Sequence, residues 1–320
     1  MTQADASPKA ATAERPAASG LETLLRAGTF VVTSETTPPL SADAEDMRAR
    51  VAPLAGVADA VNVTDGAAAR TTMASLAATA LMARDGIEPV LQFTMRDRNR
   101  LALQADLLGA SALGIANILC LHGDDVAGGD QPDAKPVWDL DSRGFIATAA
   151  AMRDDAVLPS GREIASPPAL FIGAADAPRD PDPDWSADGL RAKVAAGAQF
   201  FQTQYCFDTA IVTRYMARLG DEGLLDAASF IVGIGPIRSG KSARWMNANL
   251  RGVHIPDPII ARIEGTDDEA EEGIRVCAEL IAALNNIPGV AGAHVMGPHS
   301  EAASAEAIKR SGVLAGRASE

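Results

Sequence analysis

The 320-residue chain has few aromatic residues, only three cysteines and far fewer basic than acidic residues. Aromatic side chains make up 4% of it, which argues against a protein that binds bases by stacking. The net charge of −14 opposes non-specific binding to nucleic acids and to anionic membranes. No stretch of 18 apolar residues occurs, and the N-terminus lacks the apolar core of a secretory signal. We therefore expect a cytoplasmic protein that binds small molecules, without nucleic acid or membrane partners.

The cysteines and histidines show no metal-binding spacing. Cys120, Cys206 and Cys277 lie far apart, each inside an apolar run, which is typical of buried free thiols. An H-E-x-x-H motif or comparable ligand pattern is missing from the four histidines, which are His122, His254, His294 and His299. We expect free thiols and no metal site.

From residue 21 onward, eight apolar runs alternate with segments of helical periodicity. The runs cover residues 29–37, 58–65, 88–95, 116–124, 168–176, 200–207, 229–236 and 289–296. Eight strand–helix units predict an α/β protein, a single (β/α)8 TIM-type barrel over residues 21–320. The Ala/Pro/Ser-rich residues 1–20 are expected to form a flexible, disordered extension. A doubly wound open sheet is the alternative fold.

Polar side chains occupy the predicted strand ends, where a barrel enzyme has its active site. The set comprises Glu35, Thr64, Asp65, Gln92, Thr94, His122, Asp124, Asp176, Gln204 and Arg238. Each of these alone could be a solvated residue at the rim of a barrel. A glutamate inside VVTSETT and a glutamine inside FFQTQYCF carry more weight, because such groups are rarely placed in apolar strands without a partner or a function.

The segment GPIRSGKS, residues 235–242, matches the phosphate-binding pattern G-x-x-x-x-G-K-[ST]. It follows the seventh apolar run, and the run after it, GVAGAHVM, has no aspartate to bind the magnesium ion of a triphosphatase. We therefore predict that the segment is not a P-loop. The loop after the seventh strand of a barrel often holds phosphate. Gly235, Gly240 and Lys241 could thus face an anionic ligand or form an ordinary turn.

Several stretches occur in a characteristic order. They are SETTPP (34–39), QFTMRDRNRLALQADLLGA (92–110), LHGDD (121–125), WDLDS (138–142), KVAAGAQFFQTQYCFD (193–208) and GIGPIRSGKSARWM (233–246). Together they resemble the methylenetetrahydrofolate reductase family over about residues 28–300. The resemblance implies a barrel that binds a flavin, FAD rather than FMN. It also implies interconversion of 5,10-methylenetetrahydrofolate and 5-methyltetrahydrofolate, with NADH or NADPH as electron donor.

The resemblance further implies roles for individual residues. Glu35 and Asp124 match the family's catalytic carboxylates, and together with Gln204 they would bind the folate. Flavin-binding positions are implied for Thr64, Gln92, His122, Gly123, Asp124, Trp138, Gly173 and Lys193.

The chemistry of these residue types agrees with the implied reaction. Opening the methylene bridge of the folate requires a proton on N10, which a Glu35 kept protonated by apolar surroundings would supply. An ionised Asp124 would stabilise the resulting iminium cation beside the flavin. Gln204 would pair with the amide-like edge of the pterin and orient the substrate.

The sequence departs from the family pattern at several positions. His122 stands where an arginine is common, Gly240 where some relatives have a stacking phenylalanine, and Asp176 lies in a GAADAP segment that replaces Y-P-E. These changes bear on the electron donor, which could be NADH, NADPH or a redox protein. A flavin-free methyltransferase barrel that binds tetrahydrofolate is the alternative function. We also expect a homo-oligomer, since helical segments such as TTMASLAATALMA could lie in an interface as well as in the core.

Overall fold

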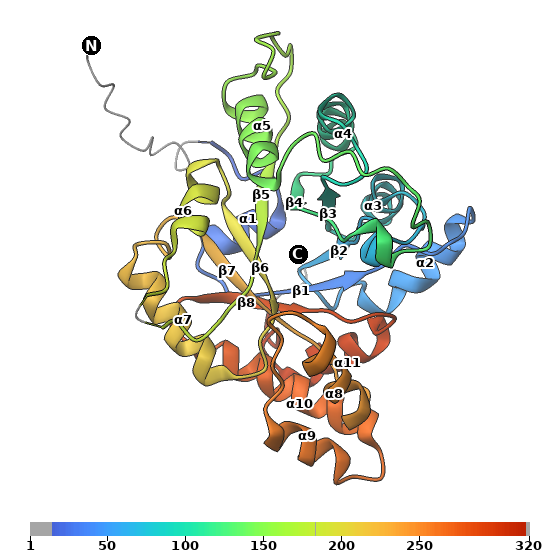
Figure 1. Cartoon of the computed structure of the whole chain (residues 1–320), viewed down its shortest axis with the longest axis vertical. Coiled ribbons are helices and arrows are strands. Elements are labelled where there is room, and N and C mark those ends of the chain that lie inside the picture. Colours follow the sequence, from blue (N-terminus) through green and yellow to red (C-terminus); the bar gives the residue numbers. More distant parts are fainter. Residues whose placement is uncertain (1–14, 183, 318–320) are drawn as a thin grey trace.

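Eight parallel strands form a closed barrel in the computed structural model, which describes residues 15–182 and 184–317 (Figure 1). The strands are β1 (Val31–Thr36), β2 (Ala60–Val63), β3 (Pro89–Thr94), β4 (Asn117–Leu121), β5 (Phe171–Asp176), β6 (Phe200–Tyr205), β7 (Ser229–Ile234) and β8 (Val290–Val295). They follow one another around the ring, and pairing of β1 with β8 closes it. The predicted (β/α)8 barrel is therefore confirmed, and closure excludes the open sheet.

Helices cover the outside and the amino end of the barrel. They are α1 (Gly20–Arg26), α2 (Ala44–Val51), α3 (Ser75–Arg84), α4 (Arg100–Ala112), α5 (Ser142–Asp154), α6 (Asp188–Ala195), α7 (Thr209–Asp221), α8 (Gly240–Asn249), α9 (Asp257–Glu264), α10 (Glu269–Leu284) and α11 (Glu301–Ser311). Short 3-10 turns are η1 (Ala52–Leu54), η2 (Ala67–Ala69) and η3 (Val126–Gly128). Three helices, α8 to α10, separate β7 from β8 and gather with α11 on the orange and red side of Figure 1.

Polar side chains cap the N-termini of several of these helices. Asn99 and Asp208 accept hydrogen bonds from the first free backbone amides of α4 and α7, and Asp141 does the same for α5. Each cap satisfies donors that have no partner inside the helix. The described part of the chain contains no helix that is long and apolar enough to cross a bilayer.

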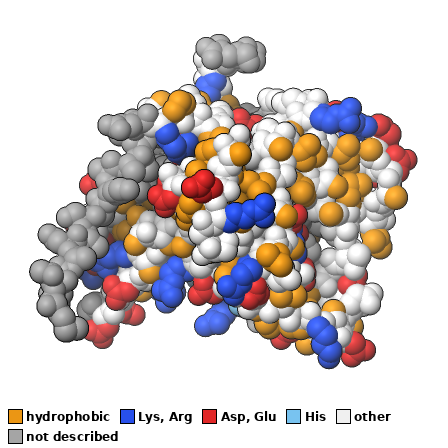
Figure 2. Space-filling model, turned by 90° about the horizontal axis from the view of Figure 1, so that it is seen from above, with side chains coloured by type: hydrophobic (Ala, Val, Ile, Leu, Met, Phe, Trp, Pro, Cys, Tyr) orange, Lys and Arg blue, Asp and Glu red, His pale blue; other side chains and the backbone are white. Residues whose placement is uncertain are grey.

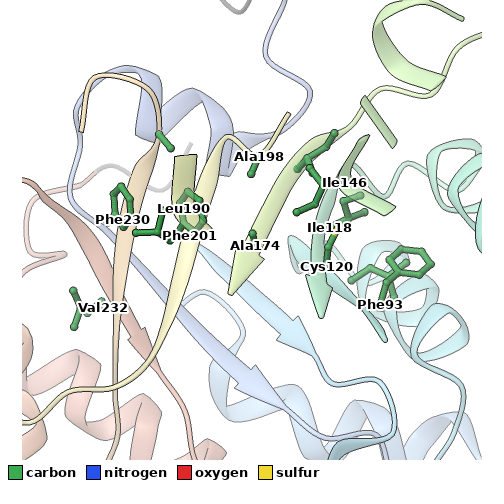
Figure 3. Packing of buried hydrophobic residues seen from close by; sticks show 14 of the residues in the cluster. Phe93, Ile118, Cys120, Ile146, Ala174, Leu190, Ala198, Phe201, Phe230 and Val232 are labelled. Atoms are coloured by element: carbon green, nitrogen blue, oxygen red, sulfur yellow. The ribbon is translucent and has the colours of Figure 1, made fainter. Parts of the chain in front are cut away.

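The main core lies between the barrel and its helices. Because successive strand residues point to opposite faces, one set of side chains faces outward. Among them, Phe201 and Phe230 stack with ring centroids 4.8 Å apart, and Ile118 packs in the same buried cluster (Figure 3). The cysteines are free and buried, and burial raises the pKa of the Cys206 thiol to about 11.

The amino end of the barrel is closed by α1. Leu21 and Leu25 pack against inward-facing residues near the starts of the strands, which include Val31, Val90, Phe171, Phe200 and Ile231. Glu22 is fully buried and forms ion pairs with Arg15 and Arg26. Of the extension expected over residues 1–20, residues 1–14 lie outside the described part. Within residues 15–19, Arg15 contacts Glu22 of α1 and Ser19 contacts Asn117 at the start of β4. The helix α1 already begins at Gly20.

Acidic and basic side chains lie next to one another on the face shown in Figure 2. Arg262, for example, pairs with both Glu272 and Glu279. The acidic surplus is thus partly compensated by local pairs, and those between exposed side chains, such as Arg262 with Glu279, add little stability.

Candidate active site

The middle of the barrel interior is polar. Thr33 of β1, Asn62 of β2, Gln202 of β6 and His294 of β8 face inward, and each is at most 4% exposed. The Gln202 amide nitrogen donates to Asn62 Oδ1 at 3.0 Å and to Thr33 Oγ1 at 3.1 Å. Thr33 Oγ1 lies 2.9 Å from His294 Nδ1. Barrel interiors are usually filled with branched apolar side chains, so a connected polar layer here indicates a function.

Glu35 lies at the upper boundary of this layer. Its side chain is 22% exposed, and its Oε2 accepts a hydrogen bond from Gln92 Nε2 at 2.9 Å. His294 Nε2 lies 3.8 Å from the same oxygen. Burial, followed by the nearby Glu35 carboxylate, raises the pKa of Tyr205 on β6. The carboxyl group therefore connects the buried polar layer to the carboxyl ends of the strands.

Asp124 lies in the exposed loop after β4 and contacts the loop after β2. Its Oδ2 accepts a hydrogen bond from the Ala68 amide at 2.7 Å. Ala68 and Ala69 both have left-handed backbone angles, with φ of 54° and 53°. The buried Arg96 joins the two loops because it donates to the carbonyl groups of Gly66, at 3.1 Å, and Asp124, at 3.2 Å. One predicted catalytic carboxylate is thus held by backbone, whereas Glu35 is held by side chains.

Several residues with implied flavin roles surround these loops. The His122 and Trp138 rings are exposed and stacked, 5.3 Å apart and 6° from parallel. Thr64 donates a hydrogen bond to Thr37 Oγ1 at 3.1 Å. Gly123 has a φ of 101°, and a Cβ there would lie 3.0 Å from Arg96 Cβ. The glycine is therefore required by backbone angle and close packing.

Lys193 lines a cavity of about 410 Å3 beside β5. Its Nζ donates to the Ala175 carbonyl at 2.6 Å, and burial lowers the pKa of its ammonium group. Asp176 lines the same cavity and accepts a hydrogen bond from Tyr215 Oη at 2.8 Å. Burial raises the pKa of Asp176. The cavity therefore contains an amine and a carboxyl group whose charged forms are both disfavoured by desolvation.

Two other predicted residues have local roles in the described fold. Gly173 leaves room for the Phe200 ring, because a Cβ at residue 173 would lie far inside contact distance of that ring. Gln204 is half-buried at the end of β6, and its side-chain oxygen accepts a hydrogen bond from the Tyr205 amide at 2.9 Å.

The GPIRSGKS segment forms the loop after β7 and the start of α8. Ser239 and Ser242 form a reciprocal capping box, and the Gly240 amide donates to Glu269 Oε2 at 2.8 Å. Lys241 is exposed. Three amides of this segment, those of Ser239, Gly240 and Ser242, are thus bound to the chain's own side chains. The ordinary-turn interpretation is the one that these contacts favour.

The roles of four residues in this polar layer were not predicted from the sequence: Thr33, Asn62, Gln202 and His294. A usable signal was present, because Gln202 is a second glutamine inside the same apolar run, two residues before Gln204. His294 is likewise a polar residue inside the apolar run GVAGAHVM. Among the described residues, no group of three or more His, Cys, Asp or Glu side chains could hold a metal ion.

Comparisons with known proteins support the fold and identify the family. A solved protein from Clostridium thermocellum, described as uncharacterized and as binding two copies of 5-methyl-5,6,7,8-tetrahydrofolic acid, is 15% identical with a TM-score of 0.62. The match covers 91% of this chain and 98% of that one. Mycobacterium tuberculosis tryptophan synthase is 13% identical over 94% of this chain and 100% of its own, with a TM-score of 0.49. At such identities the likeness to the Clostridium protein shows the fold alone. The family model described as Methylenetetrahydrofolate reductase, however, matches residues 20–312, so the chain belongs to the methylenetetrahydrofolate reductase family.

Proposed function

We propose that the protein interconverts 5,10-methylenetetrahydrofolate and 5-methyltetrahydrofolate with a bound flavin and with NADH or NADPH as electron donor. The observation that carries the proposal is Glu35, a carboxyl group at the strand ends that two side chains support from inside the barrel. Membership of the family supports the reaction class. The folate ligands of the Clostridium protein support the substrate class.

The residues present fit a flavin in chemical kind. Lys193 spends one hydrogen bond on the Ala175 carbonyl, so its remaining donors suit a phosphate group of FAD. Thr64 and Gln92 offer a hydroxyl and an amide, and the exposed His122–Trp138 stack offers an aromatic surface. When bound, the flavin would supply hydride transfer between the nicotinamide and the folate carbon.

Glu35 would act as the general acid that opens the folate ring. Gln92 and His294 both approach Oε2 of Glu35. Within the described part of the chain, Oε1 is therefore the oxygen that is available to N10 of the folate. Transfer of the proton breaks the carboxyl O–H bond, forms the N10–H bond and leaves a carboxylate. The Gln92 N–H group that donates to Oε2 would stabilise this charge as it develops.

Asp124 and Gln204 would act on the folate from the rim. Asp124 uses Oδ2 for the Ala68 amide, so Oδ1 can face the cation that forms after ring opening. Gln204 has an amide nitrogen with two donors that can pair with the pterin. Asp124 is exposed and Gln204 is half-buried, so a ligand at the rim can reach both side chains.

An absorption spectrum of the purified protein, followed by two anaerobic additions, tests the proposal. We expect flavin bands that bleach on adding NADH or NADPH and recover on adding 5,10-methylenetetrahydrofolate. A colourless protein that binds tetrahydrofolate and cannot be loaded with FAD would refute the flavin reductase and favour a methyltransferase.

A further inference from the structure

Asn62 and Gln202 form a reciprocal amide pair across the barrel. Asn62 Nδ2 donates to Gln202 Oε1 at 2.5 Å, and Gln202 Nε2 donates back to Asn62 Oδ1 at 3.0 Å. The exchange uses the carbonyl group of Gln202 and one of its two N–H groups. Both side chains are at most 4% exposed, so water does not compete for these groups. The pair therefore fixes which way the second N–H group of Gln202 points.

This second N–H group is directed at Thr33 and His294. Gln202 Nε2 lies 3.1 Å from Thr33 Oγ1 and 3.5 Å from His294 Nδ1. Because the Thr33 hydroxyl accepts from the amide, its own hydrogen is available to His294 Nδ1 at 2.9 Å. When the Thr33 hydroxyl gives this hydrogen to Nδ1, both neighbours of Nδ1 are donors, and this arrangement favours Nδ1 as the ring nitrogen without a proton.

We propose that Gln202, held by Asn62, is a positioning residue that keeps His294 in the tautomer with its proton on Nε2, aimed at Glu35. The charged group that faces the ring is Glu35, whose Oε2 lies 3.8 Å from Nε2. The hydrogen bonds therefore run in one direction, from the amide pair to the carboxyl group.

The catalytic meaning of this arrangement rests on the proposed function. When Glu35 gives its proton to the folate, the Nε2–H group faces the carboxylate that remains. The opposite tautomer would present a lone pair to that carboxylate and destabilise it. The buried amide pair would contact neither substrate nor cofactor, and it would act only through His294.

The direct test is the tautomer of His294, read from the ring nitrogens by NMR of protein labelled with 15N-histidine. The signal is assigned by its loss in His294→Asn. We expect the Nε2–H tautomer in the wild-type protein near neutral pH. Gln202→Glu replaces the donor beside Nδ1 with an acceptor, so it should move the proton to Nδ1 or produce the imidazolium form. Gln131→Glu makes the same chemical change in an exposed loop and should leave the signal unchanged.

A wild-type ring with its proton on Nδ1, or an unchanged tautomer in Gln202→Glu, would overturn the proposal. If Gln202→Glu does not fold, the double variant Asn62→Leu with Gln202→Leu removes both amides and leaves neither unpaired. The Nε2–H tautomer should then lose its preference and both tautomers should be observed. Retention of the wild-type tautomer in a folded double variant would equally contradict the role of the pair.

Turnover supplies the second measurement. In Gln202→Glu we expect kcat for the folate to fall about 10- to 100-fold and its pH profile to shift, while KM changes little. Failure of the two ideas can be told apart. A protein with the Nε2–H tautomer but without folate turnover refutes the proposed function alone, whereas normal turnover and an unshifted profile in Gln202→Glu refute the positioning role alone.

Discussion

The barrel interior and the loop after β7 both carry groups that bind protons or anions in other proteins. In the interior, Gln92 Nε2 donates to Glu35 Oε2 and His294 Nε2 lies 3.8 Å from the same oxygen, so Glu35 keeps its other oxygen available. In the loop, the Gly240 amide is bound to Glu269, and the Ser239 and Ser242 side chains cap α8. The two regions differ in where their hydrogen bonds end. A motif predicts a ligand only if the fold leaves its donors or acceptors unused.

The largest difference between the two regions is expected for the folate turnover of Glu35→Gln. A glutamine cannot supply the proton for N10, so folate turnover should fall about 100- to 10,000-fold. The half-reaction in which NADH or NADPH reduces the flavin should be retained, because it does not need that proton. Stopped-flow absorption of the two half-reactions measures both.

Glu45→Gln is the matched control for this change. Glu45 lies on α2 with 74% of its side chain exposed, so both half-reactions should stay at the wild-type rate. Normal folate turnover by Glu35→Gln would exclude Glu35 as the acid. The barrel interior would then have no demonstrated function that sets it apart from the loop after β7.

The second effect concerns the glycines of GPIRSGKS. A Cβ at Gly235 would overlap the Met296 carbonyl oxygen, which is backbone and cannot move aside. We expect Gly235→Ala to lower the free energy of unfolding by about 1–3 kcal/mol, as overpacking does. Urea unfolding measures the difference. Gly109 on α4 has open space around its Cβ position, so Gly109→Ala should keep or raise stability.

A third, smaller effect contrasts Asp176 with a surface carboxylate. Burial raises the pKa of Asp176, so the folded state keeps this proton at a pH where the unfolded state has lost it. The resulting stabilisation is present below the unfolded-state pKa and is lost as the pH rises through the folded-state pKa. Asp176→Asn should therefore flatten the decline of stability as the pH rises above about 4, the ordinary aspartate pKa, in thermal melts.

Asp180 should respond with the opposite sign. Its hydrogen bonds from Arg214 lower its pKa, so its contribution is present above the unfolded-state pKa and is lost as the pH falls through the folded-state pKa. Asp180→Asn is the control, measured in the same melts. Equal slopes for the two variants would contradict the assignment of burial as the cause at Asp176.

The smallest effect is expected for Lys241→Ala. Lys241 is exposed and the donors around it are already paired, so stability should change by less than about 0.5 kcal/mol. Folate turnover should equal that of the wild-type protein, and titration calorimetry should detect no magnesium–ATP binding in either. Magnesium–ATP binding that disappears in the variant would show that the loop after β7 does bind a nucleotide.

The eight strands could be predicted because each is an apolar run followed by a helical segment, and these features are local. The partners of Gln202 could not be predicted in the same way. Thr33 and His294 are neighbours only through the pairing of β1 with β8, which joins the two ends of the sheet. The contact between Asn62 and Gln202 crosses the barrel, so it depends on the strand register and on closure.

The rim of the site was predictable in composition but not in geometry. Asp124 stands at the expected strand end, yet its hydrogen bond to Ala68 depends on a left-handed turn in a run of alanines. Alanine rarely adopts left-handed backbone angles, so this turn could not be predicted from the amino-acid sequence. The neighbouring Arg96, with two carbonyl groups as partners, holds the turn in place.

The closure of the amino end by α1 has a kinetic consequence. Leu21 and Leu25 fill that end, so large reactants approach Glu35 from the opposite end of the barrel. If the proposed electron donor and folate use this same approach in turn, each must leave before the other enters. An excess of either reactant should therefore slow turnover by blocking its counterpart, and the inhibition should be relieved by raising the concentration of the other.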